Sequence, residues 1–247
     1  DEAVAALRRK NPTADILPAT LSLPTALSPE LVFKDNGIGM SCETVMSVYS
    51  QYGNSTKNDS NLEVGGFGLG SKTAFCYNNG STWTIESRYD GQKHVFMASI
   101  GESGIPFLAH VSSTPTKDHS GVTIRIPIIR HDMSSCYDAA ERYLPYFTLP
   151  IAVEGDSRAA GMEKKTEYIV KGDGWGIRGT VGTRYNAGRE WRIVMGNVPY
   201  DVSWHDLRLS MSHGADFYTN DFDLYVPIGS VDIVPSRDAL KMTDRTR

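Results

Sequence analysis

Short apolar runs separated by proline and glycine dominate the first 130 residues, and they predict strands. Two runs, Ala19 to Leu23 and Leu31 to Phe33, are joined by a proline-containing loop and predict a pair of strands. Between Ser41 and Gly53 the apolar residues recur at helical spacing, with Ser41 suited to cap the helix and Gly53 to end it. Four later segments alternate and predict one antiparallel meander: 81–89, 92–100, 105–111 and 121–128.

The pattern changes twice more along the chain. The segment from Asp132 to Phe147 is amphipathic and predicts a helix, which Pro145 should end or kink. After Pro150 four short strands with glycine-rich connections are expected: 168–171, 191–195, 222–226 and 231–234. We therefore predict an α+β protein with one domain over 1–150 and a second, smaller α/β domain over 151–247.

Composition narrows the class of protein. The 247 residues include 25 Lys or Arg and 29 Asp or Glu, which gives a net charge of −4 and argues against a protein that coats nucleic acid by charge. No apolar stretch is long enough to span a membrane, so at most peripheral membrane association is expected. Three cysteines without CxxC spacing favour a reducing, intracellular compartment. The chain opens with DEAVAALRRK and no methionine, so we expect it to begin within a helix, as a fragment.

Two glycine clusters carry the candidate chemistry: DNGIGM at 35–40 and VGGFGLGSKTAF at 64–75. The Walker pattern fails by one residue, because Ser71 stands where its lysine should follow Gly70. The dinucleotide pattern GxGxxG fails on glycine spacing. The arrangement that fits is an acidic residue and glycines after a strand, then a helix and loop, then a glycine-rich turn that opens a helix.

These clusters resemble the DxGxG and GxxGxG motifs of the GHKL superfamily of ATP-binding proteins, which includes gyrase B, the mismatch-repair protein MutL, a heat-shock chaperone and histidine kinases. The resemblance implies a two-layer α/β sandwich of the Bergerat type followed by a transducer-like domain. It also implies ATP with Mg2+ as ligands, a lid that closes over the nucleotide, and a homodimer that forms on nucleotide binding. The family's catalytic Glu and magnesium-binding Asn would fall before Asp1.

Within the superfamily, the run from Val45 to Tyr77 and the segment 226–240 look most like the rIIA-type proteins of tailed bacteriophages. That resemblance implies a phage protein in the host cytoplasm, at the inner face of the host membrane, that acts in lysis control or protection from prophage exclusion. It would have a host or phage protein as partner.

The first cluster would hold the adenine base. The adenine amino group is a donor, so Asp35 at a strand end could accept from it; alternatively, Asp35 only initiates a turn. Gly37 and Gly39 would let the backbone approach the base and ribose. Met40 would form an apolar wall for the adenine, or else it is a core methionine.

The second cluster would hold the phosphates through backbone N–H groups and the start of the following helix, although a flexible hinge would also explain its glycines. Its candidate residues are Gly66, Phe67, Gly68, Leu69, Gly70, Ser71 and Lys72. A lid would supply hydroxyl and ammonium donors, or else it is a solvated loop. The lid residues are Asn54, Ser55, Thr56 and Lys57.

Two further positions depart from the family pattern. Val122 stands where many members have a threonine that reaches the adenine, and Thr123 follows one place later. Because neighbouring strand residues point to opposite faces, Thr123 is a candidate but not an automatic substitute.

In the second domain, PSRD at 235–238 resembles the place where MutL-like members send a basic residue towards the terminal phosphate. The resemblance implies that Arg237 senses this phosphate with its planar guanidinium group; alternatively, Arg237 forms a surface salt bridge.

Three functions remain open on the sequence: an ATPase module, a nucleotide-gated interaction module that does not hydrolyse ATP, and a topoisomerase- or MutL-like subunit acting on DNA. Hydrolysis requires a carboxylate base and a ligand for the metal, and the sequence shows neither. The charge balance gives the DNA-acting alternative little support.

Overall fold

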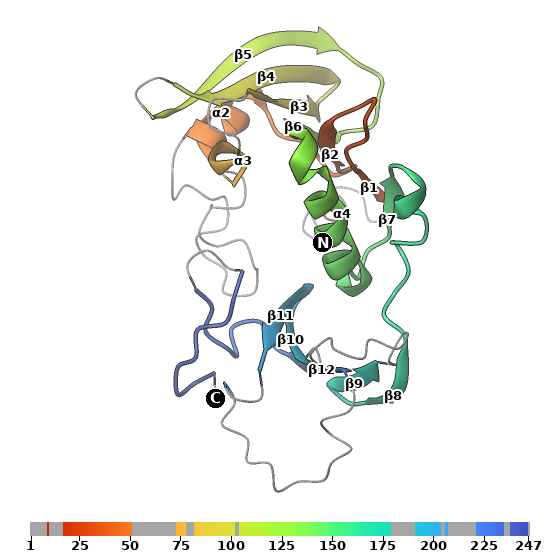
Figure 1. The fold of residues 1–247 in the computed structure, drawn as a ribbon. Coiled ribbons are helices and arrows are strands. Elements are labelled where there is room, and N and C mark those ends of the chain that lie inside the picture. Colours follow the sequence, from red (N-terminus) through yellow and green to blue (C-terminus); the bar gives the residue numbers. More distant parts are fainter. Residues whose placement is uncertain are drawn as a thin grey trace, which may run out of the picture. The chain divides into compact units, whose positions relative to one another are not determined.

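A computed structural model of the chain describes residues 9, 17–50, 73–77, 82–101, 104–178, 191–203, 206, 221–234 and 238–246 (Figure 1). The chain divides into two compact units. The first lies within residues 1–163, and the second is built from 145–148 and 164–247. The mixture of two sheets with few helices agrees with the expected α+β class.

The first unit contains a seven-stranded sheet in the order β5-β4-β3-β6-β2-β1-β7. Its strands are β1 (Ala19–Ser22), β2 (Glu30–Lys34), β3 (Trp83–Tyr89), β4 (Gln92–Ile100), β5 (Pro106–Pro115), β6 (Gly121–Pro127) and β7 (Ile151–Glu154). The antiparallel pair β1 and β2 and the hairpins β3-β4-β5 confirm the predicted strands.

Two features of this sheet differ from the prediction. Strand β6 does not continue the meander beside β5 but returns to lie between β3 and β2. This position buries the apolar face of β6, since Ile124 lies between Ile85 and Phe33 in the register and joins the core cluster. Strand β7 pairs in parallel with β1, so the first unit extends beyond residue 150.

Three helices lie on one face of this sheet (Figure 1). They are α2 (Cys42–Ser50), α3 (Thr73–Cys76) and α4 (Met133–Tyr143), with 3-10 turns η2 (Arg130–Asp132) before α4 and η3 (Leu144–Tyr146) after it. The predicted cap is confirmed, because the Thr44 N–H donates to Ser41 Oγ at 3.2 Å. The α4 helix ends before Pro145, as expected.

Buried apolar side chains join the helices to the sheet in two clusters. Val45 and Phe75 pack with Trp83, Ile85 and Phe96, and the rings of Phe75 and Trp83 meet edge to face at 5.2 Å. A second cluster packs α4 against β1 and β7. The polar residues that alternate with these core positions therefore occupy the opposite face of the sheet.

The second unit contains a five-stranded sheet in the order β11-β10-β12-β9-β8. Its strands are β8 (Tyr168–Gly172), β9 (Trp175–Arg178), β10 (Trp191–Met195), β11 (Val198–Val202) and β12 (Asp221–Val226). The prediction of a strand at 231–234 is wrong, because this segment makes only an isolated bridge between Ile233 and Leu240. Local bonds replace a ladder there; for example, the Asp232 N–H donates to Thr246 Oγ1 at 3.0 Å.

A buried polar cluster lies inside the second unit. Asp223 is fully buried, and its Oδ2 accepts hydrogen bonds from the hydroxyls of Tyr146 and Tyr168, both at 2.8 Å. Its Oδ1 lies 2.9 Å from Arg178 Nε in an ion pair. Burial raises the pKa of Tyr146 from 10.0 to about 12, and the negative charge of Asp223 adds to this rise.

We expect Tyr146 to make the second unit sensitive to alkali. Since the folded state holds the phenol proton more tightly, its contribution is complete below pH 10.0 and is lost as the pH rises to about 12. Over that window the free energy of unfolding should fall by about 2 to 3 kcal/mol because of this group. Denaturant unfolding of Tyr146→Phe should show that much less loss than the wild type, whereas Tyr143→Phe should follow the wild type. A wild-type slope in Tyr146→Phe would contradict the assignment.

No helix within the described ranges is long and apolar enough to cross a membrane.

Candidate functional site

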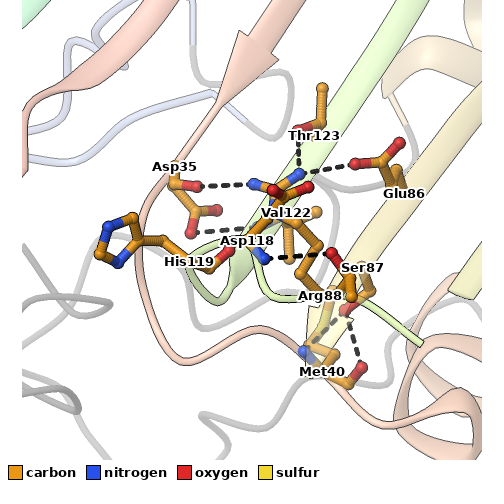
Figure 2. A network of polar contacts seen from close by, with 10 residues as sticks. Asp35, Met40, Glu86, Ser87, Arg88, Asp118, His119, Val122 and Thr123 are labelled. Atoms are coloured by element: carbon orange, nitrogen blue, oxygen red, sulfur yellow. Dashed lines mark hydrogen bonds and ion pairs between the residues drawn. The ribbon is translucent and has the colours of Figure 1, made fainter. Parts of the chain in front are cut away.

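The site is built on the loop 35–40, which leaves the end of β2 and is held against β3 and β6 (Figure 2). The Asp35 N–H donates to the Val122 carbonyl at 2.9 Å. Asp35 Oδ1 accepts from the N–H groups of Gly37 at 2.8 Å and Val122 at 3.3 Å. Among the described residues, Oδ2 receives no hydrogen bond. The structure therefore shows the turn that one interpretation of Asp35 expects, formed through Oδ1, and the contact with adenine stays a prediction.

Glycine is required in this loop by close packing. Gly39 has φ +69°, and a Cβ there would lie 2.1 Å from the Arg88 carbonyl oxygen. Gly121, at the start of β6, has φ +144°, and a Cβ there would lie 2.1 Å from the Asp35 carbonyl oxygen. Gly37 is buried, and its carbonyl accepts from Ser120 Oγ at 2.6 Å. Gly39 therefore lets the loop backbone pack closely against the backbone of β3, and this contact is within the protein and not with a ligand.

Met40 is fixed through its backbone. Its N–H donates to Ser87 Oγ at 2.8 Å, and the same hydroxyl donates to the Met40 carbonyl at 2.7 Å. The Met40 side chain is half-buried and packs against the core cluster that contains Val45 and Phe75. The structure thus shows Met40 as a core contact, and its role as an adenine wall stays a prediction.

Ser87→Ala is expected to loosen this loop. Ser87 is fully buried, and its removal would leave both polar groups of the Met40 backbone without that partner. We expect the free energy of unfolding to fall by about 1 to 3 kcal/mol, measured by urea denaturation. Ser99→Ala is the control, because the Ser99 hydroxyl makes no hydrogen bond within the described ranges. Equal losses in the two variants would contradict the role of Ser87.

Arg88 is the centre of the polar network in Figure 2. Its side chain is 5% exposed and forms an ion pair with Glu86 at 2.7 Å. Its Nε donates to the His119 carbonyl at 2.8 Å, and its Nη1 also donates to Thr123 Oγ1 at 3.0 Å. The Asp35 carbonyl lies 3.5 Å from Nη2. Arg88 therefore ties the candidate loop to β6 and to the segment before it.

Thr123 points away from the helices. Val122 packs against the helix-side core, and Thr123, buried beside Arg88, occupies the opposite face. This orientation is what strand alternation predicted. Arg88 therefore links Thr123 to the Asp35 carbonyl, whereas Met40 packs on the helix side of the sheet.

The helix α3, which follows the second glycine cluster, is anchored at its end. Tyr77 Oη donates to Asp132 Oδ2 at 2.8 Å and accepts from the Ile129 N–H at 3.2 Å. Burial and the bond to Asp132 raise the pKa of Tyr77, so its hydroxyl stays protonated as a donor. These bonds join the end of α3 to the segment that leads into α4.

The residues predicted to contact the phosphates all lie outside the described residues, so their roles stay predictions. They are Asn54, Ser55, Thr56, Lys57, Gly66, Phe67, Gly68, Leu69, Gly70, Ser71, Lys72 and Arg237. Within the described ranges no group of three or more His, Cys, Asp or Glu side chains could hold a metal ion.

Sequence reasoning missed Arg88 and Ser87. Both residues lie on β3, where the alternation of apolar residues could mark Ser87 as facing the core. No local sequence signal, however, pairs Ser87 or Arg88 with a loop about 50 residues earlier in the chain. The glycines of the loop were the available signal that some backbone approaches closely there.

Comparison with known protein families gives one match. Residues 3–104 match the family described as histidine kinase-, DNA gyrase B-, and HSP90-like ATPase. The matched range includes the whole Asp35 loop and strands β1 to β4. No curated protein matches the chain. The match supports the GHKL superfamily of ATPases for the N-terminal part of this chain.

Proposed function

We propose that the first unit is an ATP-binding module of the GHKL type, with Asp35 as the acceptor for the adenine amino group. The observation that carries this proposal is that the two oxygens of the Asp35 carboxylate have different surroundings. Oδ1 is held by two backbone N–H groups, which fixes the carboxylate, and Oδ2 has no protein donor among the described residues. A fixed carboxylate oxygen at a strand end, with no donor among the described residues, is suited to a ligand that offers a donor.

The residues around Asp35 fit an adenine base. The Met40 side chain lies half-buried at the edge of the core and offers apolar surface. The bonds from Ser87, Ser120 and Val122 hold the loop before any ligand arrives. A preformed loop of this kind reduces the ordering cost of binding.

Magnesium would bridge the phosphates of a bound ATP and lower their charge repulsion. The described residues offer no cluster of ligands for it, so we derive no hydrolytic step from them. Lid closure by 54–57, phosphate binding by 66–72 and a sensor role for Arg237 belong to the same proposal and rest on the motif resemblance. Dimerisation on nucleotide binding and a transducer role for the second unit rest on it as well.

The base specificity tests the proposal. Inosine carries a carbonyl oxygen where adenosine carries the amino group, so it would set an acceptor against the Asp35 carboxylate. In calorimetric titrations with magnesium, we expect a non-hydrolysable ATP analogue to bind about 100-fold or more tightly than its inosine counterpart. Equal affinity for the two would contradict the role of Asp35, and no binding of either would contradict the nucleotide site.

A narrower proposal is that this module belongs to an rIIA-type phage protein that acts in lysis control or protection from exclusion. Its support is the sequence resemblance over 45–77 and 226–240. A phage that carries Asp35→Asn in this gene should then fail to plate on a host with an excluding prophage while it plates on the host without one. Equal plating on both hosts would count against this narrower proposal.

A further inference from the structure

A polar hollow lies on the face of the seven-stranded sheet opposite the described helices α2, α3 and α4. It has a volume of about 790 Å3, and its floor includes Thr20, Lys34, Thr123 and Arg125. The register places Lys34 between Thr20 and Thr123 on neighbouring strands. Because Val122 and Ile124 face the helix-side core, Thr123 and Arg125 must face the hollow. Its size is that of a site for a small molecule.

Two lysines of the hollow have no ionic partner among the residues that the structure describes. Lys34 and Lys117 line it, and neither makes a hydrogen bond or ion pair within the described ranges. Arg125 has only a contact of 3.9 Å with Glu30. These three charges gather in one hollow although the chain as a whole carries a net charge of −4.

Two of the three carboxylates that line the hollow accept hydrogen bonds from protein side chains. Glu86 pairs with Arg88 at 2.7 Å, and Glu154 Oε2 accepts from Ser22 Oγ at 2.6 Å. Asp118 also lines the hollow, and its carboxylate accepts no hydrogen bond from the described part of the chain. Glu154 keeps its negative charge in the hydrogen bond with Ser22. The four Lys and Arg side chains of the lining therefore face three carboxylates, and the excess of one positive charge favours an anionic ligand.

Arg88 adds a buried donor to this surface. Its guanidinium lines the hollow and is 5% exposed, with Nε and Nη1 held by His119, Glu86 and Thr123. Its Nη2 has only the 3.5 Å contact with the Asp35 carbonyl. A fixed guanidinium fork with one weakly satisfied nitrogen is suited to a phosphate oxygen.

We propose that this hollow binds the phosphate group of a small phosphorylated molecule, at a site separate from the one at Asp35 Oδ2. A phosphate brings about two negative charges and three acceptor oxygens, which match several cations and the hydroxyls of Thr20 and Ser22. A monocarboxylate would satisfy only part of this set. The proposal does not depend on ATP binding at Asp35.

Titration with inorganic pyrophosphate, at constant ionic strength and without divalent cations, tests this site. The variants are Lys34→Ala and Arg125→Ala, with Lys93→Ala as a control on the same sheet outside the hollow. We expect saturable binding to the wild type, a loss of about tenfold in each hollow variant and a change within about twofold in the control. Circular dichroism establishes that the variants are folded.

A parallel titration at a saturating concentration of the non-hydrolysable ATP analogue separates the two sites. Pyrophosphate should still bind, with the same loss in Lys34→Ala. Disappearance of binding would place the phosphate in the nucleotide site and overturn the proposal. Absence of saturable binding to the wild type, or an equal loss in Lys93→Ala, would overturn it too. If the analogue itself does not bind, the titration without it still decides the question.

Discussion

Replacing Gly39 by alanine is expected to lower the free energy of unfolding of the first unit by about 3 kcal/mol or more. Two costs add at this position. The backbone has φ +69°, which an L side chain rarely adopts, and the new Cβ would lie 2.1 Å from the Arg88 carbonyl oxygen. Because that oxygen belongs to the backbone of β3, relief requires the loop 35–40 to move away from the strand. Urea denaturation followed by circular dichroism measures the loss.

Gly91→Ala separates the two costs. Gly91 has φ +71°, close to that of Gly39, but nothing lies within 4 Å of the position that a Cβ would take there. This variant should therefore lose only the conformational part, about 1 to 2 kcal/mol. If both variants lost the same amount, the close packing of the loop on β3 would be contradicted.

The parts of the fold that depend on local signals were predictable from the sequence. Alternation of apolar residues marked β1, β2 and the hairpins β3-β4-β5, and the Ser41 hydroxyl marked the start of α2. Pairing between distant segments was not predictable in the same way. Strand β6 was expected next to β5, but its apolar face fits between β3 and β2. The short run Ile151–Glu154 carries no signal that its partner is β1, more than 100 residues earlier.

In the candidate site, too, local features were predictable from the sequence and long-range contacts were not. Asp35, Gly37 and Gly39 were found because a local motif places a carboxylate and glycines after a strand, and the structure holds them in one turn. The orientation of Thr123 followed from alternation alone. Arg88 was missed, since the contacts that make it important join it to Asp35, His119 and Thr123 across the sheet.

Asp35→Asn is expected to weaken the binding of ATP by about 100-fold or more. Asparagine can keep an oxygen at the position of Oδ1, where it would still accept from the N–H groups of Gly37 and Val122. An amide nitrogen then replaces Oδ2, and it would set a donor against the adenine amino group. The turn should therefore persist while the acceptor for the base is lost.

Asp90→Asn is the matched control. It removes the same charge at the exposed turn between β3 and β4, away from the loop 35–40. Its ATP affinity should stay within about twofold of the wild type. Urea denaturation of both variants shows whether Asp35→Asn has kept the fold.

The measurement that tests the central claim most directly is the calorimetric titration of the wild type, Asp35→Asn and Asp90→Asn with a non-hydrolysable ATP analogue and magnesium. The account predicts saturable binding to the wild type and Asp90→Asn, and its loss in folded Asp35→Asn. Binding of the analogue to Asp35→Asn with the affinity of the wild type, or no binding to the wild type, would contradict it.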